Sequence, residues 1–461
     1  MSRTESPTRF ARPLSRREFL KAAGLGLAAA PLLAGCRRSS SGGQGTAAPG
    51  KEMTLWWWGE QEAAGMTRWM DAMRAEFEKE TGVHITPTLM DTDQVVSQFT
   101  TAAAAGNVPD VQFLYNGIYH MENVWLGYIA PLNGLVSDAV LQKSGATPLS
   151  VFEGKQYRLG AYNIGFGIAY NKEQFSKAGL NADDPPKTWD AFLNACDRLK
   201  AAGLTPIGGG VKDGYFGEWF LTNALTQNLD SPGEALDLFA GTLDWREPKY
   251  HEPWIKLEEL KQRGFLNDDI GSLELYQGTQ LYDTGKAAMC LQSTAALPHS
   301  QESLGREKVG YMVMPVFGTG KMAGIPILDA QGYGIPSRAK NPQLAAKFLE
   351  FLHTKPHVQA LWTMVRQVPS DSDFDSSVVD DPLLKTIIQK WMREKHNVYI
   401  ADLMPTQFWT EAMFVISQKI LAGELTGAQS GELAHTVKEK WKSQHPDLAL
   451  NYARWAKTLG A

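Results

Sequence analysis

Aromatic side chains stand next to carboxylates and amides at four places in the sequence. In chain order, these groups are Trp58 with Glu60 and Gln61, Tyr115 with Asn116, Tyr215 with Glu218 and Trp219, and Phe408 with Trp409. A sugar ring has an apolar face of C–H groups, which aromatic rings cover, and a rim of hydroxyls, which carboxylates and amides bind in fixed directions. These residue types therefore have the chemistry that a carbohydrate site requires.

Packing in the core is the alternative explanation for many of these rings. Successive side chains of a strand point to opposite faces of a sheet, so only part of the run Trp56–Trp58 can face a ligand. Trp58 lies nearest the end of the predicted strand and is the strongest candidate of the three. Trp69 and Trp189 lie on the apolar faces of predicted helices, which indicates packing for both.

Signatures of common enzyme classes are missing from the sequence. It contains no nucleophile elbow, no P-loop and no zinc-protease helix signature. His353 and His357 are four positions apart, but Pro356 lies between them and the first His has no Glu beside it, which argues against a metal site. We therefore expect no metal, no cofactor and no enzymatic activity.

The spacing of apolar residues predicts alternating strands and helices, which is the pattern of a parallel α/β sheet. A first strand covers Met53–Trp58, and the helix after it has an apolar face from Met66 to Phe77 and ends at Gly82. The other predicted strands are Val83–Thr86, Pro109–Tyr115, Ile164–Tyr170, Gly285–Leu291, Val309–Pro315 and Gly332–Pro336. Further helices are predicted at about 92–105, after the N-cap Thr188, at about 343–352 and over most of the chain from Asp381. Ligands of open α/β sheets bind at the carboxyl ends of strands, where Trp58 and Tyr115 fall.

The first fifty residues have the pattern of an export leader. Arg16-Arg17 precedes Phe19-Leu20-Lys21 and an apolar run, Ala22–Leu33, that is too short to span a bilayer; this resembles a twin-arginine signal. Leu33–Cys36 resembles a lipobox, in which Cys36 is acylated. We therefore expect a signal peptide at 1–35, lipidation of Cys36 and a flexible Ser- and Gly-rich tether at 36–51.

Length and composition predict a soluble protein with more than one lobe. The chain has 461 residues, whereas single hydrophobic cores stop growing near about 250–300 residues. Apolar residues make up 43% of the chain, and its formal net charge is only −5, which argues against nucleic acid as a partner. For Cys196 and Cys290, two separate buried thiols are the favoured interpretation, with a disulfide as the alternative.

Several short stretches resemble the sugar-type extracellular solute-binding proteins of ABC importers. In chain order they are Phe77–Gly82, Pro109–Val111, Ala169–Phe175, Pro186–Phe192, Gly285–Met289, Gly332–Pro336 and Ala345–Leu349. Each stretch is short, and it is their order and spacing that carry the resemblance, which extends from about Met53 to Leu459.

The resemblance implies an α/β fold of the two-lobed periplasmic-binding-protein type, with a ligand cleft between the lobes. The chain would cross between lobes near 159–163, 328–332 and 369–373. Lobe 1 would then consist of residues 52–162 and 328–370, and lobe 2 of residues 163–327 and 371–461. Hinge closure about such crossings is the behaviour expected of binding proteins.

The resemblance also implies that the four aromatic groups line the cleft. Residues near the crossings and on a neighbouring strand extend the expected site to Tyr162, Gln292, Ser293, Asp329, Gln331 and Arg366. Relatives often have a stacking Trp after the stretch that corresponds to Ala287–Met289, whereas this chain has Gln292-Ser293-Thr294. That departure implies a smaller or differently oriented sugar.

The expected function is capture of a carbohydrate and its delivery to the transmembrane subunits of an ABC importer. The protein would be an exported monomer, anchored to the cell membrane through Cys36 and facing the periplasm or the cell exterior. The alternatives are the same fold with a non-sugar solute, such as a polyamine or a glycerol phosphate, and an anchored carbohydrate-active enzyme. The expected cleft has one Glu at each of two strand ends and one Arg, which suits neither a cation nor a phosphate well.

Overall fold

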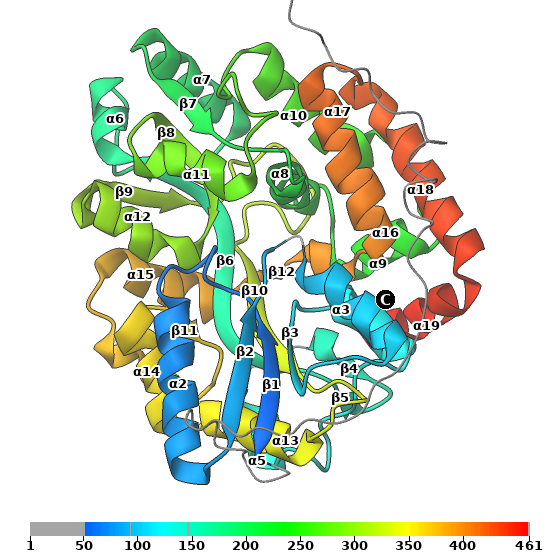
Figure 1. Ribbon diagram of the computed structural model, residues 1–461. Coiled ribbons are helices and arrows are strands. Elements are labelled where there is room, and N and C mark those ends of the chain that lie inside the picture. Colours follow the sequence, from blue (N-terminus) through cyan, green and yellow to red (C-terminus); the bar gives the residue numbers. More distant parts are fainter. Residues whose placement is uncertain (1–50, 93, 145–147, 460–461) are drawn as a thin grey trace, which may run out of the picture. The chain divides into compact units, whose positions relative to one another are not determined.

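The computed structural model describes residues 51–92, 94–144 and 148–459. The predicted signal peptide, Cys36 and the tether up to residue 50 lie outside the described residues. All described residues belong to one structural unit. A ten-stranded sheet runs through its centre and is flanked by helices (Figure 1).

Seven strands form the path of the main sheet, in the order β2-β1-β3-β10-β6-β8-β7, while β9 and β11 pair with β6 and β12 pairs with β10. The strands are β1 (Glu52–Trp57), β2 (His84–Leu89), β3 (Val111–Leu114), β6 (Leu159–Asn171), β7 (Thr205–Gly208), β8 (Ala287–Ser293), β9 (Val309–Met312), β10 (Ile327–Gly334), β11 (Val368–Pro369) and β12 (Asn397–Val398). A separate hairpin consists of β4 (Val151–Phe152) and β5 (Lys155–Gln156). Each predicted strand therefore overlaps a strand of the structure.

The sheet is mixed, which corrects the predicted parallel sheet. β1 is parallel to β2 and β3, and β7 is parallel to β8. The centre is antiparallel, because β10 runs opposite to β3 and β6, and β6 runs opposite to β8 and β9. The prediction failed there because the apolar pattern of a strand carries no information about its direction. It also missed that β10 follows β9 without the helix that a parallel crossover needs.

The three segments that we expected to connect the lobes lie side by side in this sheet. Tyr162–Asn163 of β6 pairs with Ala330–Gln331 of β10 on one edge and with Val368–Pro369 of β11 on the other. Both pairings are antiparallel, and the register of β6 with β10 shifts between Gln331 and Gly332. We call these three paired segments the central ribbon.

The helices of the first part of the chain follow the sequence signals closely. α2 (Met66–Thr81) buries Met66, Trp69, Met70, Met73 and Phe77, and it ends at Gly82, whose positive φ of 70° suits glycine. α7 (Trp189–Ala201) begins at Thr188, whose side chain accepts a hydrogen bond from the backbone N–H of Ala191. Both helices are confirmed as predicted, and so is the packing role of Trp69 and Trp189, which are buried.

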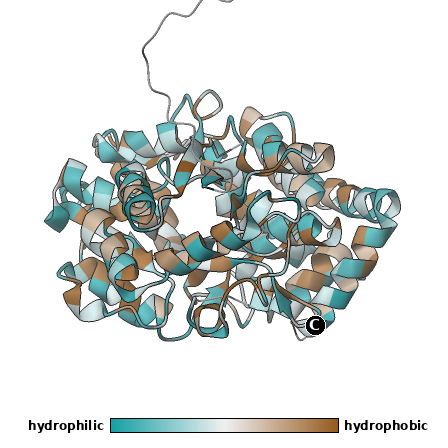
Figure 2. Ribbon diagram, turned by 60° about the horizontal axis from the view of Figure 1, so that its bottom comes forward, coloured by the Kyte–Doolittle hydropathy of each residue, from teal (hydrophilic) through white to brown (hydrophobic). Residues whose placement is uncertain are grey.

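The other helices cover both sides of the sheet, and Figure 2 shows hydrophilic and hydrophobic residues alternating along them, as expected of helices with one buried side. They are α3 (Val95–Ala105), α4 (Ile118–Trp125), α5 (Asp138–Lys143), α6 (Lys172–Lys177), α8 (Tyr215–Thr226), α9 (Pro232–Ala240), α10 (Pro248–Gln262), α11 (Leu275–Asp283), α12 (Leu297–Leu304), α13 (Pro342–Leu352), α14 (Lys355–Val365), α15 (Pro382–Ile387), α16 (Thr406–Phe408), α17 (Val415–Ala422), α18 (Ser430–Gln444) and α19 (Pro446–Thr458). Within the described ranges, no helix combines the length and the apolar character needed to cross a bilayer.

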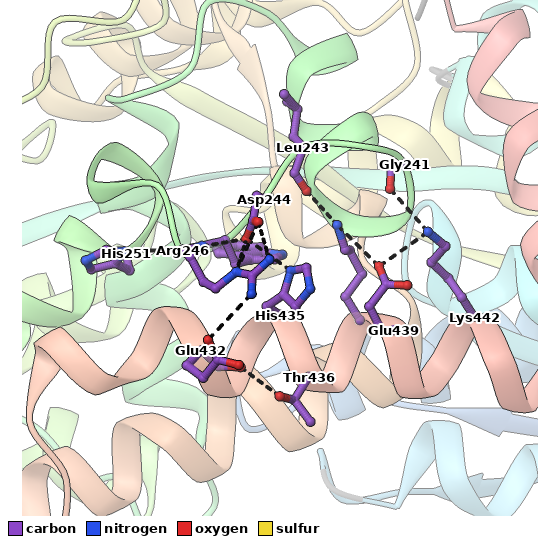
Figure 3. Close-up of polar contacts among 12 residues, drawn as sticks. Gly241, Leu243, Asp244, Arg246, His251, Glu432, His435, Thr436, Glu439 and Lys442 are labelled. Carbon is purple, nitrogen blue, oxygen red and sulfur yellow. Dashed lines mark hydrogen bonds and ion pairs between the residues drawn. The ribbon is translucent and has the colours of Figure 1, made fainter.

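Polar contacts hold α18 against the segment that follows α9 (Figure 3). Asp244 accepts hydrogen bonds from Arg246, and Nδ1 of His435 on α18 lies 3.0 Å from Oδ1 of Asp244. Lys438 is buried and donates from Nζ to the carbonyl oxygen of Leu243 at 2.5 Å, and burial lowers its pKa. These contacts fix the C-terminal helices to the rest of the unit.

Cys196 on α7 and Cys290 on β8 are both buried and both free. The favoured interpretation of two separate thiols is therefore confirmed. Burial raises the pKa of both thiols, which keeps them protonated.

Candidate functional site

A cavity of about 40 Å³ lies at the ends of β1 and β3. Segments far apart in the sequence line it, from the end of β1 to the 3-10 helix η6 (Ile400–Leu403) and the π-helix η7 (Trp409–Phe414). Its lining consists of Trp58, Glu62, Thr92, Tyr115, Tyr119, Phe166, Tyr215, Glu218, Trp219, Leu275, Tyr276, Asp329, Gln331, Tyr399, Asp402 and Trp409. Nine of these residues are aromatic and four carry a carboxyl group.

Half of the lining consists of residues that the sequence had singled out. The structure brings together Trp58, Tyr115, Tyr215, Glu218, Trp219, Asp329, Gln331 and Trp409. Trp58 follows β1 and Tyr115 follows β3, which agrees with the rule that sites form at the carboxyl ends of strands. The other contributors come from α8, from β10 and from the start of η7.

Three further predicted residues stand behind the lining and contact its carboxyl groups. The hydroxyl of Tyr162 lies 3.3 Å from Oε2 of Glu62, and Ser293 lies beside the same carboxyl. Asn116 interacts with Asp329 and receives a hydrogen bond from Ser150. These residues position the lining without themselves facing the cavity.

Glu60 and Gln61 line a wider depression beside the cavity. Glu60 accepts hydrogen bonds from the backbone N–H groups of Gly65 and Thr67 at the start of α2. Gln61 accepts from the backbone N–H and the hydroxyl of Thr92.

The remaining three predicted residues lie elsewhere. The side-chain amide of Gln292 donates to Ser300 in the core. Arg366 pairs with Asp381, at 3.2 Å between Nη2 and Oδ2. Phe408 is fully buried and stacks on Trp245, with their ring centroids 4.9 Å apart. The Met-Pro turn before Phe408 therefore directs only Trp409 into the cavity.

Sequence reasoning missed eight of the lining residues, namely Glu62, Thr92, Tyr119, Phe166, Leu275, Tyr276, Tyr399 and Asp402. Two signals could have found some of them. Glu62 continues the polar run that begins at Glu60, and Tyr119 lies four positions after Tyr115, on the helix that follows it. Nothing in the local sequence connects Tyr399 and Asp402 to the site, because they join it only through the fold.

Aromatic rings surround the cavity on both sides. The ring of Trp409 lies 4.6 Å from that of Tyr119 and 5.4 Å from that of Tyr215, both edge to face. Phe166 stacks on Tyr399, with their centroids 4.0 Å apart. Trp409 is the first residue of a π-helix, an irregularity that is frequent at functional sites.

Burial disfavours the ionised form of two glutamates of the lining. Burial raises the pKa of Glu62 to about 8, although contacts with Ser293 and Tyr162 lower it in part. Burial raises the pKa of Glu218 to about 7, against hydrogen bonds from Tyr399 and Thr222. Neither carboxyl has a basic side chain among these partners.

Asp329 and Asp402 form a carboxyl pair next to Arg158. Burial raises the pKa of both, and the nearby charge of Asp329 raises that of Asp402 further, so Asp402 donates a hydrogen bond to Asp329. Arg158 is fully buried behind them and donates to the carbonyl oxygens of Leu114 and Ala330. Its charge favours the ionised form of both carboxyls.

The fold provides specific supports for this pair. The hydroxyl of Tyr452 on α19 donates to the carbonyl oxygen of Leu403 at 2.7 Å and thereby holds the segment that carries Asp402. A Cβ atom at Gly332 would lie 2.0 Å from the carbonyl oxygen of Leu159 and 3.0 Å from the guanidinium carbon of Arg158. Glycine at this position is therefore needed for the close approach of β10 to Arg158.

Several buried acceptors and hydroxyls of the lining have no hydrogen-bond partner among the described residues. They are Oη of Tyr115, Oε1 of Gln331 and Oδ2 of Asp402. Gln331 is only 3% exposed and Asp402 only 1%. A buried polar atom without a partner costs free energy, so a polar group of a ligand could form a hydrogen bond with each of these atoms.

His353 and His357, which we weighed as metal ligands, have other partners. Nδ1 of His353 lies 2.8 Å from Oδ2 of Asp371, and Nδ1 of His357 contacts the carbonyl oxygen of Phe351. Among the described residues, no group of three or more His, Cys, Asp or Glu side chains is arranged to hold a metal ion.

Comparison with known proteins shows the family of this chain. A family described as bacterial extracellular solute-binding protein matches residues 59–358. The chain is 29% identical over 201 residues to the sn-glycerol-3-phosphate-binding periplasmic protein of Shigella dysenteriae, and this match covers 42% of this chain and 44% of that protein. The chain thus spans less than half the length of that relative.

Solved structures match over most of the described chain. A chitin oligosaccharide binding protein has a TM-score of 0.75 and 25% identity, with coverage of 85% of this chain and 99% of the other. A maltose/maltodextrin-binding domain from Bdellovibrio bacteriovorus, bound to maltotriose, has a TM-score of 0.68 and 18% identity, with coverage of 85% and 100%. The expected two-lobed α/β fold is thereby confirmed.

Proposed function

Because this chain belongs to the bacterial extracellular solute-binding protein family, we propose that it captures a carbohydrate in the cavity described above and delivers it to an ABC importer. The observation that carries the proposal is the lining itself, in which nine aromatic residues stand among four carboxyl groups and a glutamine. Aromatic faces cover the apolar faces of sugar rings, while the carboxyl and amide groups bind hydroxyls. The solved structures of similar fold include proteins named for binding oligosaccharides.

The proposed mechanism is closure of two lobes around the sugar. With lobe 1 at 52–162 and 328–370 and lobe 2 at 163–327 and 371–461, seven lining residues belong to lobe 1 and nine to lobe 2. A ligand that contacts both walls favours the closed form, and the importer's transmembrane subunits would recognise that form. Moving the equilibrium from 1:99 to 99:1 requires a difference in affinity of about 5.5 kcal/mol between the two forms.

The proposed location is the outer side of the cell membrane. The twin-arginine leader would direct export, and an acylated Cys36 with the tether after it would hold the receptor, as a monomer, at the bilayer near the importer. One acyl chain alone gives only reversible membrane binding, so stable anchoring requires more than one chain. Replacement of Cys36 by Ser should therefore release the protein from the membrane fraction.

Glycerol phosphate is the second candidate ligand, because a relative is named for it. The charge of the cavity argues against it. A phosphate group is normally held by arginines, lysines or helix N-termini. The helices α8 and α11 begin at the lining residues Tyr215 and Leu275, but none of the described lining residues is Lys, Arg or His and four carry a carboxyl group.

A thermal-shift screen of the mature chain with Cys36→Ser tests the proposed function. Its panel includes mono- and oligosaccharides, polyamines and glycerol phosphates. A ligand at a hundred times its dissociation constant adds about 2.7 kcal/mol of stability, which raises the melting temperature measurably. A shift with sugars supports the proposal, whereas a shift with only glycerol phosphate or only polyamines contradicts it.

A further inference from the structure

The charges in the cavity lining are all of one sign. Glu62, Glu218, Asp329 and Asp402 contribute four carboxyl groups, and none of the described lining residues is basic. All four carboxyl residues are at most 5% exposed. Ionised carboxylates buried to this degree need a compensating positive charge, or they stay protonated.

The positive charge of Arg158 acts on only two of these four carboxyl groups. It acts on Asp329 and Asp402, from behind the cavity wall. The partners of Glu62 and Glu218 among the described residues are neutral donors. They are Tyr162 and Ser293 for Glu62, and Thr222, Tyr399 and Trp409 for Glu218. Two buried carboxyls are therefore without a cation from the described part of this chain.

Two of the unpartnered atoms of the lining are acceptors. Oε1 of Gln331 and Oδ2 of Asp402 are buried and accept no hydrogen bond from the described residues. An ammonium group carries three donors and no acceptor, so it matches such atoms, whereas a hydroxyl brings only one donor. The nine aromatic rings of the lining also attract a cation through their faces.

The depression beside the cavity has the same sign of charge. It shares Thr92 and Tyr276 with the cavity, so the two spaces adjoin. Its carboxyl groups are those of Glu60, Asp91, Asp213 and Glu274, and its described lining again includes no Lys, Arg or His. Lys212 pairs with Glu274, with 2.9 Å between Nζ and Oε1. An acidic approach of this kind attracts cationic ligands and repels anionic ones.

We propose that the carbohydrate bound by this cavity is an amino sugar with a free, protonated amine, whose ammonium group lies between Glu62 and Glu218. This inference rests on the proposed carbohydrate function and specifies its substrate class. The rings of the lining cover the sugar faces, and the carboxyl groups neutralise the amine. A neutral sugar would leave the neutral form of Glu62 and Glu218 favoured, whereas an ammonium group favours their ionised form and so gains charge-assisted hydrogen bonds. A linear polyamine would supply the charge but offers no ring face for the aromatic residues to cover.

Isothermal titration with a matched pair of sugars tests the inference. The probes are the β-1,4-linked disaccharide of glucosamine and the same disaccharide with both amines acetylated, with cellobiose as the uncharged parent and spermidine as a cation without a sugar ring. We expect the free-amine disaccharide to bind about tenfold or more tightly than the acetylated one, because charge-assisted hydrogen bonds are roughly twice as strong as neutral ones.

Two variants and a control test whether Glu62 and Glu218 cause the preference for the free-amine disaccharide. Glu62→Gln and Glu218→Gln keep the size and the neutral hydrogen bonding of the protonated acid, and each should reduce the preference for the free amine severalfold. Glu122→Gln is the matched control, because Glu122 is a half-buried glutamate with a raised pKa of about 7 that contacts Thr406 and does not line the cavity. It should keep the preference.

The outcomes separate the inference from the proposed function. Equal or tighter binding of the acetylated disaccharide or of cellobiose overturns the inference and leaves the carbohydrate function intact. Binding of spermidine alone overturns both. A preference for the free amine that survives in both cavity variants also overturns the inference, because the amine is then recognised elsewhere.

Discussion

The hydroxyl of Tyr215 donates a hydrogen bond to the backbone carbonyl oxygen of Thr92, with 3.1 Å between the two oxygens. Tyr215 begins α8, whereas Thr92 lies between β2 and α3. In the proposed division of the chain, the two residues belong to different lobes. The bond therefore joins the walls of the cavity directly, without a ligand.

Tyr215→Phe should weaken this link while keeping the ring, which contacts Trp409 and Phe414. A hydrogen bond of this kind contributes about 0.5–1.5 kcal/mol, so ligand affinity should fall by up to about tenfold. Small-angle scattering of the unliganded variant should show a larger radius of gyration. Unchanged affinity and dimensions would mean that this bond does not favour the closed form.

Trp409→Ala should reduce ligand affinity by about tenfold or more, because truncation of a central buried tryptophan at a binding site often costs at least about 2 kcal/mol. The indole contacts Tyr119, Tyr215 and Phe414, so its loss also opens the cavity. Titration of the ligand found in the thermal-shift screen measures the effect.

The neighbouring Phe408 provides the control for that variant. Phe408→Leu removes packing against Trp245 and Phe239, away from the cavity. It should lower the free energy of unfolding by about 1 kcal/mol and leave the affinity unchanged. If both variants lose affinity equally, the effect of Trp409→Ala is structural and not due to a contact with the ligand.

The stability of the unliganded protein should fall as the pH rises from about 5 to about 8. The pKa of Glu62 is raised to about 8 and that of Glu218 to about 7, both from 4.5. The folded state therefore binds more protons than the unfolded state in this window, which makes stability decrease with pH. Their contribution is complete below about 4.5 and is lost as the pH passes the folded-state values.

Melting temperatures across that window provide the measurement, and Glu62→Gln provides the comparison. The amide does not ionise, so the variant should lose less stability between pH about 7 and about 8 than the wild type does. Parallel curves for the two proteins would show that Glu62 is not the group that titrates.

Gly332→Ala should destabilise the protein by about 1–3 kcal/mol, because forcing extra atoms into a close-packed site displaces its surroundings. The added Cβ would lie 2.0 Å from the carbonyl oxygen of Leu159. Gly271→Ala is the matched control, since nothing lies within 4 Å of the Cβ position there. Chemical denaturation compares them, and an unchanged midpoint for Gly332→Ala would contradict the close approach of β10 to Arg158.

The sequence predicted the parts of the site that depend on local signals. Trp58 and Tyr115 are aromatic residues at strand ends, and Tyr215 and Trp409 stand next to turns and polar side chains, so the local chemistry identified all four. The helices with regular apolar spacing and caps, such as α2 and α7, were predictable for the same reason.

The parts that depend on long-range pairing were not predictable. Asp402 and Asp329 meet only because η6 and β10 come together in the fold, and in the sequence each carboxyl resembles an ordinary solvated charge. From the sequence we expected too few carboxyl groups in the cleft to bind a cation. Glu62 and Asp402 raise the number of carboxyl groups in the lining to four. Phe408 and Trp409 are adjacent in sequence, but Phe408 packs in the core and Trp409 lines the cavity. The π-helix that begins at Trp409 sets these two directions.

The central ribbon has a mechanical consequence. Its three strands are joined laterally by backbone hydrogen bonds at Tyr162–Asn163, so sliding one strand along another would break the ladder, whereas a shared bend would not. If the cavity opens by bending at the ribbon, all three strands bend together, and each backbone dihedral angle changes only slightly. In the proposed division into lobes, the ribbon would therefore let the lobes bend relative to each other and would resist their sliding or twisting apart.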